Sequence, residues 1–219
     1  MHEPSIAAAD PRFDGDVFVV DQPFTLFVNR YFVHTAADDG FTPGELMVFC
    51  RQKPVALKED LRLFADEGMT DEILRIKARR VVDIGGRYLV SIPDGTTIGA
   101  LERRAKASLL RTTWAIRGAD DAELAIIQEH SVGVAILRRV QNVLQVIPFI
   151  GSVLAVVFDL IPIPYHFDIL HGDTLIGRHT RKYGIRDRYR LQLDGDPQRL
   201  IDRRLVVAMA IALDALQSR

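Results

Sequence analysis

The longest uninterrupted apolar stretch of the chain lies close to its C-terminus. Every residue from 205 to 213 is apolar, so no face of a helix there suits water, and a helix that is apolar all round is a buried one. Asp196 is a favourable N-cap residue, and Pro197 suits the first helical position. A membrane-spanning helix needs about 20 apolar residues, more than this stretch provides. The pattern therefore predicts a central helix over residues 197–217 that the rest of the protein encloses.

One carboxylate, Asp214, follows this apolar stretch directly. An isolated buried charge is costly, so a buried Asp214 needs a cationic or hydrogen-bonding partner. The simpler interpretation is that the helix has reached the mouth of the fold at this residue. We therefore expect the Asp214 side chain to lie at the mouth.

Ahead of the helix, the chain has the pattern of short strands separated by turn signals such as Asp-Gln-Pro, Asp-Asp-Gly and Pro-Gly. In one of these strands, Leu74 and Ile76 share one face while Arg75 and Lys77 share the other. Such alternation predicts one buried face and one solvated face. The first five predicted strands cover residues 17–20, 24–33, 45–53, 55–65 and 73–81.

A weak internal repeat follows, in which each copy has a strand that opens with an aromatic residue, a turn, and a second strand. The copies begin at Tyr88, Trp114, Tyr165 and Tyr189, and the last runs directly into the helix. Their turns are rich in Gly and Asp, which are typical of hairpins. With the earlier strands they make roughly 12, enough to close a sheet and remove its edges. The predicted fold is mainly β (α+β class): a closed antiparallel barrel around the C-terminal helix.

Composition predicts a single domain. The chain has 219 residues, of which 48% are hydrophobic and 26% charged, and this suffices for a substantial core. Cys50 is its only cysteine, which excludes an internal disulfide and a Cys-based zinc site. The N-terminus lacks the basic end and apolar run of a signal peptide, so we expect a cytoplasmic protein. Residues 1–15 are expected to be a disordered lead-in, and residues 16–219 the domain.

An apolar insert, residues 131–164, separates the second and third copies of the repeat. Within 143–163 only three residues are clearly polar, and two prolines, a glycine and an aspartate interrupt a continuous helix. We therefore expect two short helices rather than a transmembrane segment. The pair either packs on the barrel or covers one of its mouths, or it meets a membrane or a second subunit. In the latter cases the contacting residues are Phe149, Ile150, Leu154, Val157 and Phe158.

No catalytic or metal-binding motif stands out. The sequence has no Gly-x-Ser-x-Gly elbow, no Gly-rich phosphate loop and no His-Glu-x-x-His, and its six histidines are scattered. The stretch from Asp194 to Asp196 resembles the start of a calcium loop, but Leu205 occupies the twelfth position, where a bidentate Glu is needed. We expect no catalytic residue, no metal and no cofactor.

Basic residues provide the only indication of a ligand, since the net charge of −1 gives no general attraction to nucleic acid. Such clusters either hold a phosphate or form an ordinary solvated face. One cluster lies between the first two hairpins and comprises Arg103, Arg104, Lys106 and Arg111. A second comprises Arg178, Arg181, Lys182, Arg186, Arg188 and Arg190.

Three segments resemble the scramblase-like and LURP-one-related proteins of the tubby C-terminal superfamily. They are ILRIKARRVVDIGGRYLVSIPDGTTIGALERR, LLRTTWAIRGADDAELAIIQE and DRRLVVAMAIALDAL. The resemblance covers roughly residue 16 to the end, and it implies a barrel of roughly 12 strands around a C-terminal helix. Tubby domains bind phosphoinositides through basic surface residues, scramblases are linked to phospholipid movement, and many relatives have no known role. The failed calcium loop counts against calcium-driven lipid transfer.

The sequence thus favours a non-enzymatic protein that binds an anionic phospholipid or phosphoinositide, or docks at a membrane as a peripheral protein. Its predicted headgroup site is Arg103, Arg104, Lys106 and Arg111, assisted by apolar contacts from the insert. The alternative is an interaction or homo-oligomeric assembly module that uses the insert as its interface. Nucleic acid is not an expected partner, because aromatic residues are sparse among the basic ones.

Overall fold

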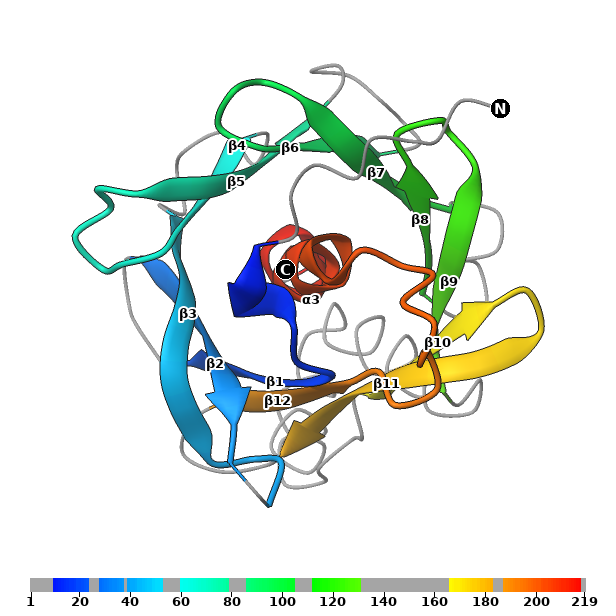
Figure 1. Ribbon diagram of the computed structural model, residues 1–219, viewed down its shortest axis with the longest axis horizontal. Coiled ribbons are helices and arrows are strands. Elements are labelled where there is room, and N and C mark those ends of the chain that lie inside the picture. Colours follow the sequence, from blue (N-terminus) through cyan, green and yellow to red (C-terminus); the bar gives the residue numbers. More distant parts are fainter. Residues whose placement is uncertain are drawn as a thin grey trace, which may run out of the picture.

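The computed structural model describes residues 10–23, 28–37, 39–52, 60–78, 86–104, 112–130, 166–182 and 187–217. Within these ranges, twelve antiparallel strands form a closed barrel around a C-terminal helix (Figure 1). This confirms the predicted fold class. The predicted apolar insert, residues 131–164, lies outside the described residues. No helix in the described part of the chain is long and apolar enough to cross a membrane.

The barrel is a continuous meander that closes on itself. Each strand pairs with its neighbours in the sequence, and β1 pairs with β12 to complete the ring. Among the described strands, each one therefore has a paired neighbour on both sides, although β3 and β4 share only two register pairs. The strands are β1 (Val17–Gln22), β2 (Asn29–Ala36), β3 (Pro43–Gln52), β4 (Asp60–Phe64), β5 (Glu72–Ala78), β6 (Arg87–Ser91), β7 (Thr97–Arg103), β8 (Thr113–Gly118), β9 (Glu123–Glu129), β10 (His166–His171), β11 (Thr174–Lys182) and β12 (Asp187–Gln192).

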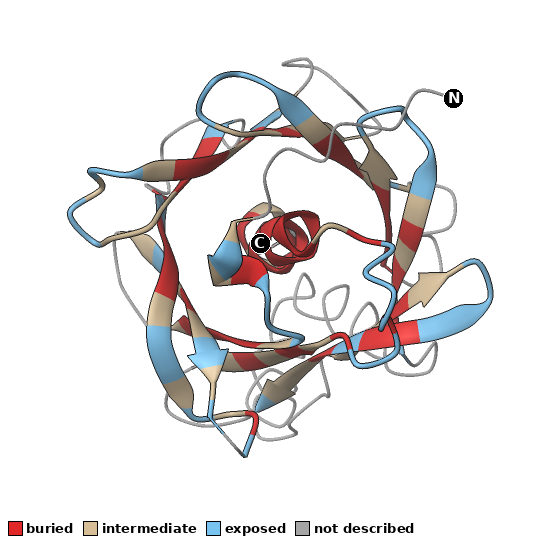
Figure 2. Ribbon diagram, viewed as in Figure 1, coloured by how far each residue is buried: buried red, intermediate tan, exposed pale blue. Residues whose placement is uncertain are grey.

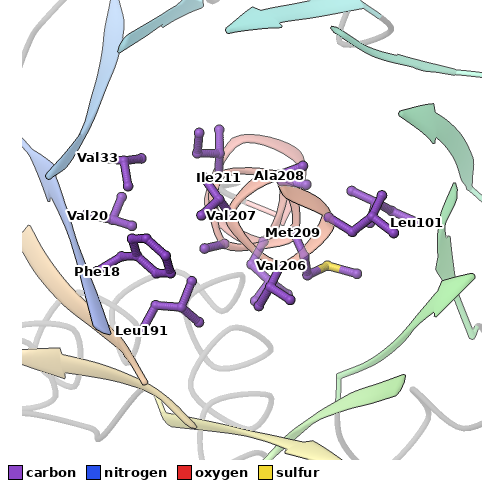
Figure 3. Close-up of a cluster of buried hydrophobic side chains, with 14 of the residues drawn as sticks. Phe18, Val20, Val33, Leu101, Leu191, Val206, Val207, Ala208, Met209 and Ile211 are labelled. Carbon is purple, nitrogen blue, oxygen red and sulfur yellow. The ribbon is translucent and has the colours of Figure 1, made fainter. Parts of the chain in front are cut away.

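The core lies between the inner face of the barrel and the central helix, α3 (Arg203–Gln217). Figure 2 shows α3 almost wholly buried, while the tips of the hairpins are exposed. In Figure 3, Phe18, Val33 and Leu191 point from the wall toward α3. Strand β5 has the predicted faces, since Leu74 and Ile76 are fully buried and Lys77 is exposed. The alternation of side chains along each strand therefore builds the core.

The central helix begins at Arg203, six residues after the predicted start. Asp202 caps it, because its carboxylate accepts a hydrogen bond from the Arg204 amide at 2.9 Å. Asp196 instead caps the irregular turn before the helix, where its carboxylate accepts two backbone N–H groups at 2.9 and 3.2 Å. Both aspartates satisfy the sequence rule for an N-cap, and the structure uses the later one for the helix. Residues 205–213 are all buried, as predicted.

The two ends of the barrel differ in their connections. We call the end at which α3 begins the turn end, and its short connections are residues 37–42, 65–71, 92–96, 119–122 and 172–173. We call the opposite end, at which α3 finishes, the loop end. The connections at the loop end lie mostly outside the described residues.

A short N-terminal element packs against the turn end. It is the 3₁₀ helix η1 (Pro11–Phe13), and Phe13 belongs to the buried core at 4% exposure. Figure 1 shows it beside α3 inside the ring. The predicted lead-in over residues 1–15 thus includes a short 3₁₀ helix with a buried aromatic side chain in its described part, residues 10–15. Residues 1–9 lie outside the described part.

Buried ion pairs fasten the start of α3 to this end. The Arg203 side chain is 2% exposed, and its guanidinium contacts the fully buried carboxylate of Asp196 at 2.5 Å. The same guanidinium contacts Asp16, just before β1, at 2.7 Å. One arginine therefore joins the first strand, the turn after the last strand and the central helix.

Candidate anion-binding surface

A concentration of basic side chains lies on the outer face of β11 and β12. Tyr189 and Leu191 of β12 are buried, so the alternate residues, Arg188 and Arg190, point outward. Lys182 of β11 lies directly opposite Arg188 in the register. Like charges directly opposite each other on two strands are unfavourable. The arrangement therefore costs stability unless carboxylates or a ligand balance it.

Neighbouring strands supply carboxylates to two of the outward arginines. Arg188 contacts Asp21 of β1, with 3.3 Å between Nε and the carboxylate oxygen. On the other side, Arg178 of β11 contacts Asp168 of β10 at 3.5 Å. His130 also contacts Asp168, at 2.8 Å. These arginines are thus partly neutralised.

Lys182 and Arg190, which we call the cationic pair, have a different environment. Among the described residues, no carboxylate oxygen lies within 4.0 Å of their charged nitrogens. The two side chains instead contact the half-buried ring of Phe41: Lys182 Nζ lies 5.3 Å and Arg190 Cζ 5.6 Å from its centroid. Both distances fall in the range of cation–π contacts. The pair is therefore in contact with an aromatic ring and forms no direct ion pair within the described residues, although the Asp39 carboxylate lies near enough to Lys182 for a weak charge interaction.

Phe41 reaches the cationic pair because the β2–β3 hairpin bends toward it. Register shifts interrupt the pairing of β2 and β3 on both sides of His34, and such irregularities bend a ribbon. The tip of the hairpin consequently lies beside the end of β11 (Figure 1). The site is thus assembled from segments that are far apart in the sequence.

Local hydrogen bonds fix the shape of the tip. The Asp39 carboxylate accepts the backbone N–H of Phe41 at 2.9 Å and both the backbone N–H and the hydroxyl of Thr42 at 2.7 Å. The bonds from Thr42 and Phe41 lower the pKa of Asp39 to about 2. Gly40 has φ +68°, and a Cβ there would come within 2.7 Å of the Arg190 guanidinium. The tip therefore requires glycine for its conformation and for its contact with Arg190.

The structure describes only two of the four residues of the first predicted cluster, Arg103 and Arg104. Arg104 forms an ion pair with Glu123 of β9, and Arg103 is exposed at the loop end of β7. Lys106 and Arg111 lie outside the described residues. The shared headgroup site therefore stays a prediction, and one of its members is already held by a carboxylate.

Outside this cluster, the outer face of β6–β9 carries further ion pairs. Arg117 contacts Glu102 at 2.6 Å, and Arg87 contacts Asp121 at 2.5 Å. The hydrogen bond that Arg117 donates to the Glu102 carboxylate is the main cause that raises the pKa of Arg117. Arginines are less frequent here than on β11–β12, and carboxylates engage Arg87, Arg104 and Arg117.

The second predicted cluster divides in the structure. Lys182, Arg188, Arg190 and Arg178 share the outer face, whereas Arg181 lies over the Tyr189 ring at 5.9 Å. Arg186 lies outside the described residues, as do the predicted contact residues of the insert. Phe41 was not among the predicted site residues, although an aromatic residue within the turn signal Asp-Asp-Gly-Phe-Thr is unusual enough to indicate it.

Comparison with known families assigns the chain to a group. A family model described as LURP-one-related matches residues 46–214, most of the barrel and most of α3. The chain belongs to the LURP-one-related family. Domains of this family are generally non-enzymatic. No curated protein matches the chain. The matched span includes the cationic pair, whereas Phe41 precedes it.

The interior of this LURP-one-related barrel holds a polar group near the loop end. The half-buried carboxylate of Asp214 accepts hydrogen bonds from the hydroxyls of Tyr31 at 2.9 Å and Tyr189 at 3.4 Å. Burial and the neighbouring Asp214 charge raise the pKa of Tyr31. Asp214 thus lies near the mouth at the loop end, and it also has hydrogen-bond partners from the barrel wall, which the sequence did not predict.

A histidine lies beside this group. His179 is 3% exposed, and neither ring nitrogen has a hydrogen-bond partner in the described structure. Its ring stacks on Tyr189, with 5.0 Å between centroids, and is tilted against Phe167 at 6.2 Å. Burial lowers the pKa of His179 to about 4, with a smaller effect from His166. At neutral pH, His179 is an uncharged core residue.

The described residues contain no metal-binding cluster of three or more His, Cys, Asp or Glu side chains. Asp196, at the failed calcium loop, is already bound to Arg203. Among the described residues, Arg30 and Arg51 also lie opposite each other, on β2 and β3, without an ion pair. The cationic pair differs from them in its contact with an aromatic ring. Its charged groups suit an anion with several oxygen atoms, such as a phosphate.

Proposed function

We propose that this LURP-one-related protein binds the phosphate groups of anionic phospholipids and docks at a membrane as a peripheral protein, without catalysing a reaction. The observation that carries the proposal is the cationic pair, Lys182 and Arg190. Its charges share one outer face and have no carboxylate partner in the described residues. A placement in the tubby-like superfamily, with its phosphoinositide-binding members, is part of the proposal.

The size of the effect follows from surface electrostatics. Each Lys or Arg close to an anionic membrane contributes about 1 kcal/mol to binding. The protein's net charge of −1 gives no general attraction, so binding depends on where the cations gather. The cationic pair supplies the main charge, and Arg178 and Arg188 add to it partially because Asp168 and Asp21 offset them.

The test is flotation of the purified protein with neutral phosphatidylcholine vesicles and with vesicles that also contain phosphatidylserine or a phosphoinositide. We expect binding to the anionic vesicles only. Replacing Lys182 and Arg190 together by Gln should weaken it roughly 30-fold. Arg117→Gln is the matched control, since Glu102 engages that arginine on another outer face, and it should change binding by less than about twofold.

Two outcomes contradict this assignment. If the folded protein stays unbound with every vesicle, lipid binding is rejected. If Arg104→Gln weakens binding more than the double variant does, the headgroup site is the first cluster, Arg103 to Arg111. Light scattering of the same samples tests the alternative, a homo-oligomeric module. A stable dimer that does not bind any of the vesicles would favour the assembly module over the membrane-docking protein.

A further inference from the structure

We propose that Phe41 is the apolar anchor of this surface, and that its ring enters the interfacial region of the bilayer while the cationic pair binds phosphates on either side. This inference rests on the proposed lipid binding. It adds the residue that inserts and the depth at which the protein sits. In this proposal, the tip of the β2–β3 hairpin is the part of the protein that contacts the acyl chains.

The position of Phe41 is unusual for a purely structural side chain. It occupies a tight turn, where Gly, Asn, Asp, Ser and Pro are the ordinary residues. The ring is only half buried and does not belong to the buried core of the barrel. The charged ends of Lys182 and Arg190, on the neighbouring strands β11 and β12, both lie close to it. A phenyl ring beside two surface cations has the composition of a membrane-interface contact.

The conformation of the hairpin tip is fixed by its own hydrogen bonds, so the position of the Phe41 ring is set before the protein binds a membrane. The Asp39 carboxylate binds the backbone of Phe41 and Thr42, and Gly40 packs its Cα against Arg190. Ordering a side chain on binding costs entropy, and a preformed tip reduces that cost. The rigid turn therefore favours insertion of a single ring.

The two functions of the cations are compatible. A cation–π contact at an exposed site is weaker than a charge-assisted hydrogen bond to a phosphate oxygen. Phosphate groups can therefore take the charges of Lys182 and Arg190 without competition from the ring. The ring, now flanked by neutralised cations, gains by moving from water into the interface.

Fluorescence measures this insertion directly. The only native tryptophan, Trp114, is 1% exposed inside the barrel, so its spectrum is a constant background. Phe41→Trp should show a blue shift with vesicles of equal parts phosphatidylcholine and phosphatidylserine, and bromine-labelled acyl chains should quench it. Pro93→Trp is the control, because the β6–β7 turn lies across the barrel from the β2–β3 tip (Figure 1). Its emission should not change.

A second pair of variants keeps the test independent of the probe. Phe41→Ala should weaken binding to the same vesicles roughly tenfold, and Phe41→Leu should restore most of it. If the Phe41→Trp protein floats with the vesicles but its emission is neither shifted nor quenched, the anchor is rejected while lipid binding stands. If neither this variant nor the native protein floats, the anchor is rejected together with the function on which it rests.

Discussion

Arginines at two places in this barrel have opposite surroundings. Arg203 at the turn end is 2% exposed and lies between the carboxylates of Asp196 and Asp16. Arg190 on the outer face of β12 has an aromatic ring beside it and, among the described residues, no carboxylate. We call Arg203 the enclosed arginine: it holds three parts of the chain together, and its carboxylate partners leave no room for a ligand. We call Arg190 and its surroundings the open site: this arginine contributes little to the fold and is available to bind an anion. The same residue type thus has a structural role where carboxylates surround it and a proposed binding role where they do not.

The largest effect on stability should come from breaking the buried ion pair between Arg203 and Asp196. Arg203→Met leaves the buried Asp196 carboxylate without its cation, which should lower the free energy of unfolding by about 3–5 kcal/mol. Arg190→Met is the matched substitution at the open site and should cost no more than about 0.5 kcal/mol. Urea denaturation monitored by circular dichroism measures both. Equal losses for the two variants would contradict the comparison.

The enclosed histidine should make stability depend on pH. Burial lowers the pKa of His179 to about 4, from 6.5. Between these values the unfolded chain binds a proton that the folded protein excludes, so unfolding is favoured as the pH falls. Stability should therefore be full above pH 6.5, and its loss should approach about 3 kcal/mol near pH 4.

Denaturant titrations at several pH values measure that loss. His179→Phe keeps an aromatic ring in the stack and removes the titrating group. The pH dependence between 6.5 and 4 should then become shallower. An unchanged slope would mean that other groups cause it.

A smaller effect should follow from the enclosed carboxylate of α3. Tyr31→Phe removes the shorter of the two hydroxyl bonds to Asp214 and leaves one carboxylate oxygen without that donor. The cost should be about 1–2 kcal/mol. Tyr189→Phe removes the longer bond, of 3.4 Å, and should cost less. Thermal unfolding of both variants checks the order, and the reverse order would be inconsistent with the distances.

The smallest effect should be a gain at the open site. Asp39→Asn keeps an oxygen that can accept the Phe41 and Thr42 amides but removes a negative charge near Lys182. Affinity for anionic vesicles should rise roughly two- to fivefold. Asp94→Asn is the control, because Asp94 accepts the Thr96 amide at 2.7 Å in the β6–β7 turn. A similar gain in affinity from this control would contradict the claim that Asp39 acts through its position near Lys182.

The barrel could be predicted because the pattern of apolar and polar residues within each short segment indicates its secondary structure and its buried face. Alternation in β5, aromatic starts at Tyr88 and Trp114, and the apolar stretch of α3 each report which face is buried. The start of α3 was misplaced because Asp196 and Asp202 are both suitable caps. Of these two aspartates, Asp196 forms the ion pair with Arg203, and no local sequence pattern marks that contact.

The candidate site was less accessible to sequence reasoning. Lys182 and Arg190 were recognised as basic, but many nearby arginines looked the same. What distinguishes them is their contact with Phe41, which comes from another hairpin. This contact depends on strand register and on the irregular pairing of β2 with β3. Spacing along the chain does not record these contacts.

The pairing of β1 with β12 has a consequence for synthesis. A ribosome releases the strands in order, and the helix that fills their ring emerges after all of them. Until then the growing sheet has two free edges and an uncovered apolar face, and the contacts that close it join distant parts of the chain. High contact order of this kind slows folding. The nascent protein should therefore spend its synthesis incomplete, and it should depend on chaperones until its last helix is made.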